Sequence, residues 1–249
     1  MLKDCLHQYR PSLGFISESQ TFQSDIGGLM QHIQGEYCFF LNSEDYHDPE
    51  IALMKNTTSG GTLLLWRKDL DPYISIHPVQ TSSFSPLVLK MPGYQITAHI
   101  ALYLPTHGKD ASFVSDLADL RNCLEELRDT YPDCLIFIRG DSNVNRKNKS
   151  RVSLLTQLMS DFTLKKVDIP HNTYHHFVGD GQFDSSIDVL LHSDDKQTEE
   201  KVFKIICKHE NPLVLSHHDI ILSTATLPAI PLATPSSYLL LEYLMKGRK

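Results

Sequence analysis

The feature of this sequence that most restricts its fold is a series of short, β-rich runs, several of them apolar at nearly every position. The run CLIFI, at 134–138, has no polar face, so we expect a strand buried on both sides of a sheet. Helical spacing occurs instead from Phe113 to Tyr131 and from Val152 to Phe162. The strand-like runs are 13–17, 36–41, 62–66, 94–105, 134–138, 186–192, 202–207 and 218–223. This pattern predicts layered sheets with helices outside.

Composition and charge exclude several classes of protein. The 41% hydrophobic content of the 249 residues is too high for disorder, and the net charge of −7 argues against binding nucleic acid by bulk charge. Neither a membrane span nor a signal peptide is visible, so we expect an intracellular protein, nuclear or cytoplasmic, neither secreted nor membrane-bound. The five cysteines are widely spaced without CxxC, which predicts neither a disulfide framework nor a zinc site.

Polar residues follow the apolar run at 134–138. Asp141 and Asn143, two residues apart on an extended backbone, point the same way, so a carboxylate and an amide would lie together at the end of a sheet. Such a carboxylate can hold a metal or orient a water, and the amide can bind a developing anion. Asp and Asn are also common in turns. This stretch alone does not decide between a site and a turn.

Three further strand ends carry polar side chains. Asp188 lies within an apolar strand, where a carboxylate is costly unless it is paired. A histidine of the 216–219 stretch, at the start of another strand, could pair with it, and the carboxylate would then fix the imidazole tautomer. Glu18 ends an early strand and Tyr103 ends a long one.

Taken in order, these motifs resemble the endonuclease/exonuclease/phosphatase (DNase I-like, AP-endonuclease-like) family over about residues 10–224. Within this family, the motifs of this sequence are most similar to those of the endonuclease domain of non-LTR (LINE-type) retrotransposons. The resemblance implies an α/β (α+β) fold, a four-layer sandwich of two mostly antiparallel sheets flanked by helices. The matching stretches are SE at 17–18, SGG at 59–61, TLLLW at 62–66, LYLP at 102–105, GDSN at 140–143, SSID at 185–188 and SHHD at 216–219.

The resemblance also implies metal-dependent hydrolysis of a phosphodiester, as in a DNA endonuclease of retrotransposon type. Glu18 would bind Mg²⁺, and Asp141 would orient or deprotonate the attacking water. Asn143 and His218 would contact the phosphate, with His218 supported by Asp188, and Tyr103 would lie near the scissile bond. DNA is the expected partner, and no obligate protein partner is inferred.

Two departures from the family pattern qualify this expectation. The family opens with a strand that ends in a metal-site Asn, whereas residues 1–12 contain no Asn, so we expect the first strand to be missing. His217 stands where the family has an Asp of the metal site, and imidazole suits Mn²⁺ better than Mg²⁺. A catalytically impaired, retroelement-derived remnant and a phosphatase of the same superfamily are therefore the alternatives.

Two segments complete the prediction. Four basic residues follow the GDSN motif and could contact a DNA backbone, although an ordinary solvated loop would look the same: Arg146, Lys147, Lys149 and Arg151. The nuclease-like domain is expected at 1–224. Residues 225–249 then form a linker, with three prolines between Leu227 and Pro235, and a short C-terminal helix.

Overall fold

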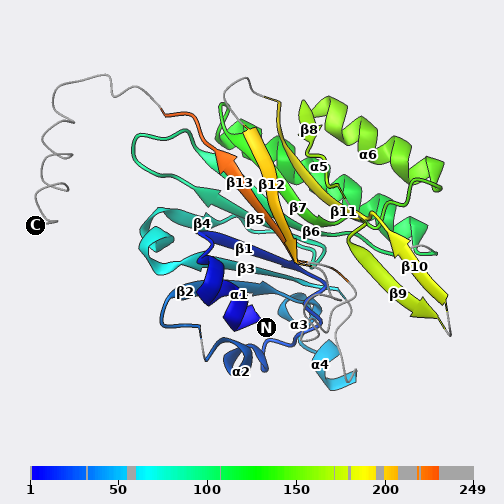
Figure 1. Cartoon of the computed structure of the whole chain (residues 1–249), viewed down its shortest axis with the longest axis horizontal. Coiled ribbons are helices and arrows are strands. Elements are labelled where there is room, and N and C mark those ends of the chain that lie inside the picture. The colour runs from blue at the N-terminus through cyan, green and yellow to red at the C-terminus, as the bar shows by residue number, and fades with distance from the viewer. Residues whose placement is uncertain are drawn as a thin grey trace, which may run out of the picture.

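A computed structural model describes residues 2–31, 33–54, 60–106, 108–170, 172–178, 181–194, 199–206, 218 and 220–229. Its largest element is a six-stranded sheet in the order β4-β5-β6-β7-β11-β8, in which only β6 and β7 run parallel (Figure 1). The strands are β4 (Ile74–Ile76), β5 (Phe84–Leu89), β6 (Thr97–Tyr103), β7 (Leu135–Asp141), β8 (Leu164–Lys166) and β11 (Asp188–Ser193). The parallel pair is connected by helix α5 (Asp110–Thr130).

A second, antiparallel sheet packs against the first. Its order is β1-β3-β2, formed by β1 (Leu13–Ser17), β2 (Tyr37–Asn42) and β3 (Thr62–Arg67). Side chains alternate along β3, as expected of a strand. Leu64 and Trp66 pack between the sheets with Leu87 and Ala101, whereas Leu63 and its neighbours face the outer helices. The uniformly apolar TLLLW run is thus buried on both faces, as its sequence predicts.

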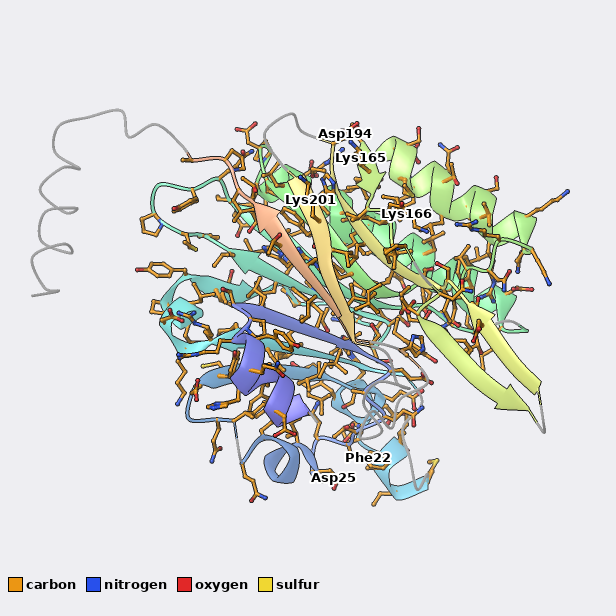
Figure 2. The ribbon with its side chains drawn as sticks, viewed as in Figure 1. Phe22, Asp25, Lys165, Lys166, Asp194 and Lys201 are labelled. Atoms are coloured by element: carbon orange, nitrogen blue, oxygen red, sulfur yellow. The ribbon has the colours of Figure 1, made fainter. Side chains whose placement is uncertain are left out.

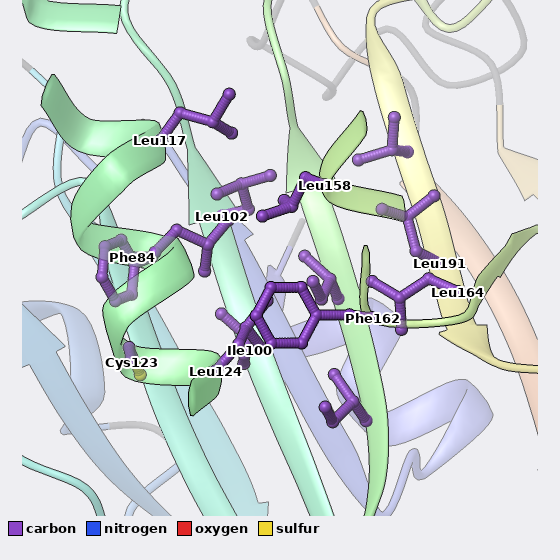
Figure 3. Close-up of a cluster of buried hydrophobic side chains, with 14 of the residues drawn as sticks. Phe84, Ile100, Leu102, Leu117, Cys123, Leu124, Leu158, Phe162, Leu164 and Leu191 are labelled. Atoms are coloured by element: carbon purple, nitrogen blue, oxygen red, sulfur yellow. The ribbon is translucent and has the colours of Figure 1, made fainter. Parts of the chain in front are cut away.

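Helices cover both outer faces. On the six-stranded sheet, α5 and α6 (Lys149–Asp161) bury a cluster around Phe84, Ile100, Leu124 and Leu158 (Figure 3). On the other side lie α1 (Leu2–Tyr9) and α2 (Ile26–Met30). The remaining helices are α3 (Glu44–His47), α4 (Ile51–Met54) and the 3₁₀ helix η1 (Lys68–Tyr73). The predicted four-layer α/β sandwich is confirmed.

Two antiparallel hairpins complete the fold. One pairs β9 (Tyr174–Val178) with β10 (Gly181–Ser185) and extends away from the sheets; the other pairs β12 (Glu199–Ile206) with β13 (Ile220–Thr226) (Figure 1). Beyond β13, Ala229 bridges Tyr94. The predicted C-terminal helix lies outside the described residues.

The strand β5 is not among the strand-like runs expected from the sequence, and it contains Pro86. Proline lacks the N–H that a sheet ladder needs, so it usually argues against an inner strand. Here the Pro86 carbonyl accepts from the His77 amide just past the end of β4, and the missing N–H would point to the same side, where β4 has already ended. Proline at this position therefore removes no hydrogen bond between β5 and β6.

The outer strand β8 is protected at its edge by charge. It carries the exposed Lys165 and Lys166 (Figure 2). Lysines at such a position hinder pairing with a strand of another molecule. Among the helices that the structure describes, none is long and apolar enough to cross a membrane.

Candidate active site

Sheet register brings three of the predicted site residues together. In the parallel pair, Tyr103 at the end of β6 lies opposite Asp141 at the end of β7. On the other side of β7, Asp188 at the start of the antiparallel β11 also lies opposite Asp141. A phenol and two carboxylates, far apart in the sequence, therefore share one edge of the six-stranded sheet. The Asp141 side chain is buried, with 3% of its surface exposed.

Close packing behind Asp141 explains the glycine that precedes it. Gly140 has φ +139°, and a Cβ there would lie 2.1 Å from the Leu102 carbonyl oxygen and 2.4 Å from Ser17 Oγ. The Ser17 hydroxyl donates to that carbonyl (2.7 Å) and accepts from the Asp141 amide (3.3 Å). Ser17 thus connects the second sheet to the first directly beneath the site.

Asn143 is held in a turn that faces back toward Asp141. Its backbone has φ +50°, a conformation that residues other than glycine seldom adopt. Its amide N–H donates to Asp141 Oδ1 (2.7 Å), and its side-chain Nδ2 donates to Asp141 Oδ2 (2.9 Å) and to the Leu104 carbonyl (2.8 Å). Both Nδ2 hydrogens are engaged, so in this state Asn143 orients Asp141, and it must release one bond to contact a phosphate.

His218 lies between the two aspartates. Its Nδ1 is 3.1 Å from both Asp188 oxygens, and its Nε2 is 3.6 Å from Asp141 Oδ2. A bridge to Tyr174 of β9, whose ring packs edge-on against the imidazole, helps to hold His218 in place. Asp188 also accepts from the fully buried Thr173 hydroxyl. The predicted pairing of Asp188 with a histidine of the 216–219 stretch is therefore confirmed, with His218 as the partner.

Glu18 approaches the same edge from the second sheet. It follows β1 with φ +54°, and its Oε1 accepts from the Tyr103 hydroxyl (3.3 Å) and from Gln20 Nε2 (3.0 Å). The Tyr103 ring packs on Gly60, where a Cβ would lie 2.7 Å from Tyr103 Cε1. Two residues other than glycine, Glu18 and Asn143, thus have positive φ at one site, and backbone strain of this kind commonly occurs at functional sites.

The electrostatics of the site reflect burial and concentrated negative charge. Burial, followed by the charges of Asp188 and Glu18, raises the pKa of Asp141 to about 7 even though His218 opposes the shift. Burial lowers the pKa of His218, but Asp188, Asp141 and Glu18 outweigh it, so its pKa is raised overall. Burial and the charges of Glu18 and Asp141 also raise the pKa of Tyr103. The site can therefore hold and exchange a proton near neutral pH.

The donor set suits a hard divalent cation in part. Glu18 supplies a carboxylate, and the charges that raise the pKa values of Tyr103 and Asp141 are ones that a cation would offset. No three Asp, Glu, His or Cys side chains within the described ranges form a ready-made metal centre. His217, the other predicted ligand, lies outside those residues.

The basic residues after Asn143 divide into two groups. Arg146, Lys147 and Lys149 are exposed beside the site. Arg151 is buried, with 2% of its surface exposed, and it pairs with Asp110. The prediction that Arg151 contacts DNA is therefore wrong, because its guanidinium does not reach the surface.

Sequence reasoning missed Ser17, Thr173 and Tyr174. Ser17 belongs to the SE stretch at 17–18, but only Glu18 receives a role there, and nothing in the local pattern marks Thr173. Tyr174 stands in the HNTYHHF stretch, whose sequence alone gives this tyrosine no role at the site. Only the pairing of distant strands shows that these side chains meet Asp141, Asp188 and His218.

Neither a protein-family model nor a curated protein matches this sequence. Solved structures do match. The endonuclease domain of TRAS1, a telomere-specific non-LTR retrotransposon, is 13% identical with a TM-score of 0.62, covering 94% of this chain and 92% of that one. D. rerio TDP2 complexed with a single-strand DNA product is 13% identical with a TM-score of 0.53, and the match covers 82% of this chain and 80% of that one. A Bacteroides thetaiotaomicron mannosyl-6-phosphatase is 13% identical with a TM-score of 0.57, covering 90% and 89%. At these identities the likeness establishes a shared fold.

Proposed function

We propose that this chain, whose fold is that of the endonuclease/exonuclease/phosphatase proteins, hydrolyses phosphodiesters as a DNA endonuclease of the non-LTR retrotransposon type. The observation that carries the proposal is the line of side chains from Asp141 through His218 to Asp188, beside Glu18 and Tyr103. A buried carboxylate with a pKa near neutrality, next to an imidazole held by a second carboxylate, is a pair suited to proton transfer.

The geometry supports distinct roles for the two members of the pair. Asp141, ionised above about pH 7, would orient the attacking water and accept its proton. His218, whose protonated form is favoured by Asp188, would place a positive charge against a phosphate oxygen, where negative charge grows during in-line attack. Thr173 and Asp188 fix the ring so that Nε2 faces the reaction centre.

We also propose that the site binds Mg²⁺, or Mn²⁺ in its place, through Glu18 and the predicted ligand His217. When bound, the ion would supply neutralisation of charge on the phosphoryl and leaving oxygens. The Tyr103 hydroxyl, which donates to Glu18 Oε1, would keep this carboxylate in place.

DNA is the proposed substrate. The exposed Arg146, Lys147 and Lys149 directly follow the turn that contains Asn143, so they can neutralise backbone phosphates next to the cut. Two proteins of this fold, a retrotransposon endonuclease domain and a TDP2 complexed with a DNA product, support this choice. We further propose that the protein acts inside the cell, in the nucleus or the cytoplasm.

A substrate panel tests the proposal. The purified chain is offered supercoiled plasmid, a single-stranded oligonucleotide and a sugar phosphate, each with Mg²⁺, with Mn²⁺ or with EDTA. Metal-dependent nicking of the plasmid is the expected result. Release of phosphate from the sugar phosphate alone would favour the phosphatase alternative, since a mannosyl-6-phosphatase has the same fold. No turnover of any substrate by the folded chain would favour the inactive remnant.

A further inference from the structure

Arg151 is the largest side chain among those that are almost fully buried. It lies in the first turn of α6, and its guanidinium packs over the Phe113 ring of α5 at 4.3 Å. Burying a cation is costly unless its donors are satisfied. Its partners therefore indicate why the position carries an arginine.

Those partners lie on the two loops that leave the active-site edge and, in Asp110, at the first residue of α5. Arg151 NH1 donates to the carbonyls of Pro105 (2.6 Å) and Asn143 (3.3 Å). Its NH2 donates to the Thr106 carbonyl (2.8 Å) and its Nε donates to Asp110 Oδ1 (2.9 Å), which also forms an ion pair with NH2 (2.8 Å). A guanidinium has five N–H donors. The four hydrogen bonds engage all three of its nitrogens.

The two loops hold the proposed catalytic groups. One begins directly after Tyr103, and the other contains Asn143, whose amide groups orient Asp141. The loops are also bonded to each other, since Asn143 Nδ2 donates to the Leu104 carbonyl and the Leu104 amide donates to the Asp141 carbonyl. Arg151 lies behind this junction and bonds to both sides of it.

We propose that Arg151 is a positioning residue for the active site. Its guanidinium fixes the loop after Tyr103 against the loop of Asn143, and so holds Asn143 in its left-handed turn and Asp141 in its reacting orientation. The effect on turnover rests on the proposed hydrolase function. The effect on the loops does not, so the two can be tested separately.

The decisive variants are Arg151→Met and Arg151→Lys, with Arg128→Met as the matched control. Arg128, in α5, also packs over an aromatic ring, that of Phe162 (5.0 Å), and donates to the Phe162 carbonyl (2.6 Å). Phe162 caps the C-terminal end of α6, away from Arg151 in its first turn. Arg151→Met keeps the packing on Phe113 and loses every donor. Arg151→Lys keeps the charge with three donors instead of five, and serves if the methionine variant does not fold.

Two measurements are made on each folded variant. Amide hydrogen exchange of Leu104 and Asn143 reports the loops without any substrate, and kcat and KM for plasmid nicking report the reaction. We expect faster exchange at both amides in the Arg151 variants only. We also expect kcat to fall about 100-fold in Arg151→Met, as displacement of reacting groups by about an ångström would cause, with KM little changed and a smaller loss in Arg151→Lys.

Each outcome has a defined meaning. Unchanged exchange in the Arg151 variants overturns the proposal, as does a loss of kcat no larger than that of Arg128→Met. Faster exchange with full activity also overturns it, because the loops would then not control the reaction. A wild-type chain that cuts nothing contradicts the proposed function, and exchange still decides whether Arg151 fixes the loops.

Discussion

Replacing Asp141 by asparagine should remove activity and yet stabilise the folded chain at alkaline pH. The side chain is buried, and burial raises its pKa from 3.8 to about 7. Between these two values the folded state retains a proton that the unfolded state has released. The free energy of unfolding therefore falls as pH rises through this window. An asparagine does not ionise, so the variant does not undergo this fall in the free energy of unfolding.

The pKa difference sets the size of the effect. About three pKa units correspond to a ceiling of about 4 kcal/mol, reached above pH 7. The stability advantage of Asp141→Asn is smaller than this ceiling, because asparagine weakens the contact with His218 and the hydrogen bond from Asn143 Nδ2. The growth of the advantage comes from the ionisation of Asp141, and the interval from pH 5 to pH 8 covers about two pKa units of the window, so we expect the stability advantage of Asp141→Asn to grow by about 2–3 kcal/mol over this interval.

Urea denaturation in metal-free buffer at pH 5 and pH 8 measures this difference. Asp161→Asn is the control, because Asp161 pairs with Arg121 and its pKa is lowered, so no growing advantage is expected. An advantage of Asp141→Asn that is flat or shrinks toward pH 8 would refute the reasoning. In that case burial does not raise the pKa of the Asp141 carboxyl toward neutrality, and its assignment as a proton acceptor near pH 7 is unsupported.

Three further predictions follow from the geometry of the site. Asp188→Asn should lower the pKa of His218, seen by NMR titration of the imidazole, and reduce kcat about 100-fold; an unchanged titration would contradict the pairing. Gly140→Ala should cost about 3 kcal/mol or more in urea unfolding, because its Cβ would lie 2.1 Å from a carbonyl oxygen; near-neutral stability would show that the backbone can move aside. Replacing Arg146 and Lys147 together by glutamine should reduce the salt dependence of DNA binding by about two in slope, whereas Arg10→Gln, which directly follows helix α1, should not; equal slopes would exclude this loop from the DNA contact.

The layered fold follows from patterns that are local in the sequence. Uniformly apolar runs such as TLLLW and CLIFI require burial on both faces, which only an inner strand between two layers provides. The α5 helix is equally clear from its spacing. The strand β5 is not recognisable from its own residues. Whether an inner strand can contain Pro86 depends on where the neighbouring strand β4 ends, and that is set by another part of the sequence.

The site is predictable where a carboxylate, whose burial costs free energy unless it is paired, stands in or next to an apolar strand. Asp141 and Asp188 are recognisable because buried carboxylates need partners, and the structure supplies His218 between them. Arg151 shows the limit of this reasoning. A run of basic residues resembles a DNA-binding loop, but α6 begins at Lys149 and turns this arginine inward onto Phe113. Which residues of a charged run are buried depends on the helix phase and on the packing partner.

The most direct test of the central claim is nicking of supercoiled plasmid in Mg²⁺ by the wild-type chain, Asp141→Asn and Asp161→Asn, with EDTA as the blank. If Asp141 and His218 form the hydrolytic pair, the wild type and Asp161→Asn nick the plasmid at similar rates, EDTA abolishes nicking, and Asp141→Asn is inactive while remaining folded. Nicking by Asp141→Asn at the wild-type rate would contradict the account, because the reaction would then not depend on this carboxylate.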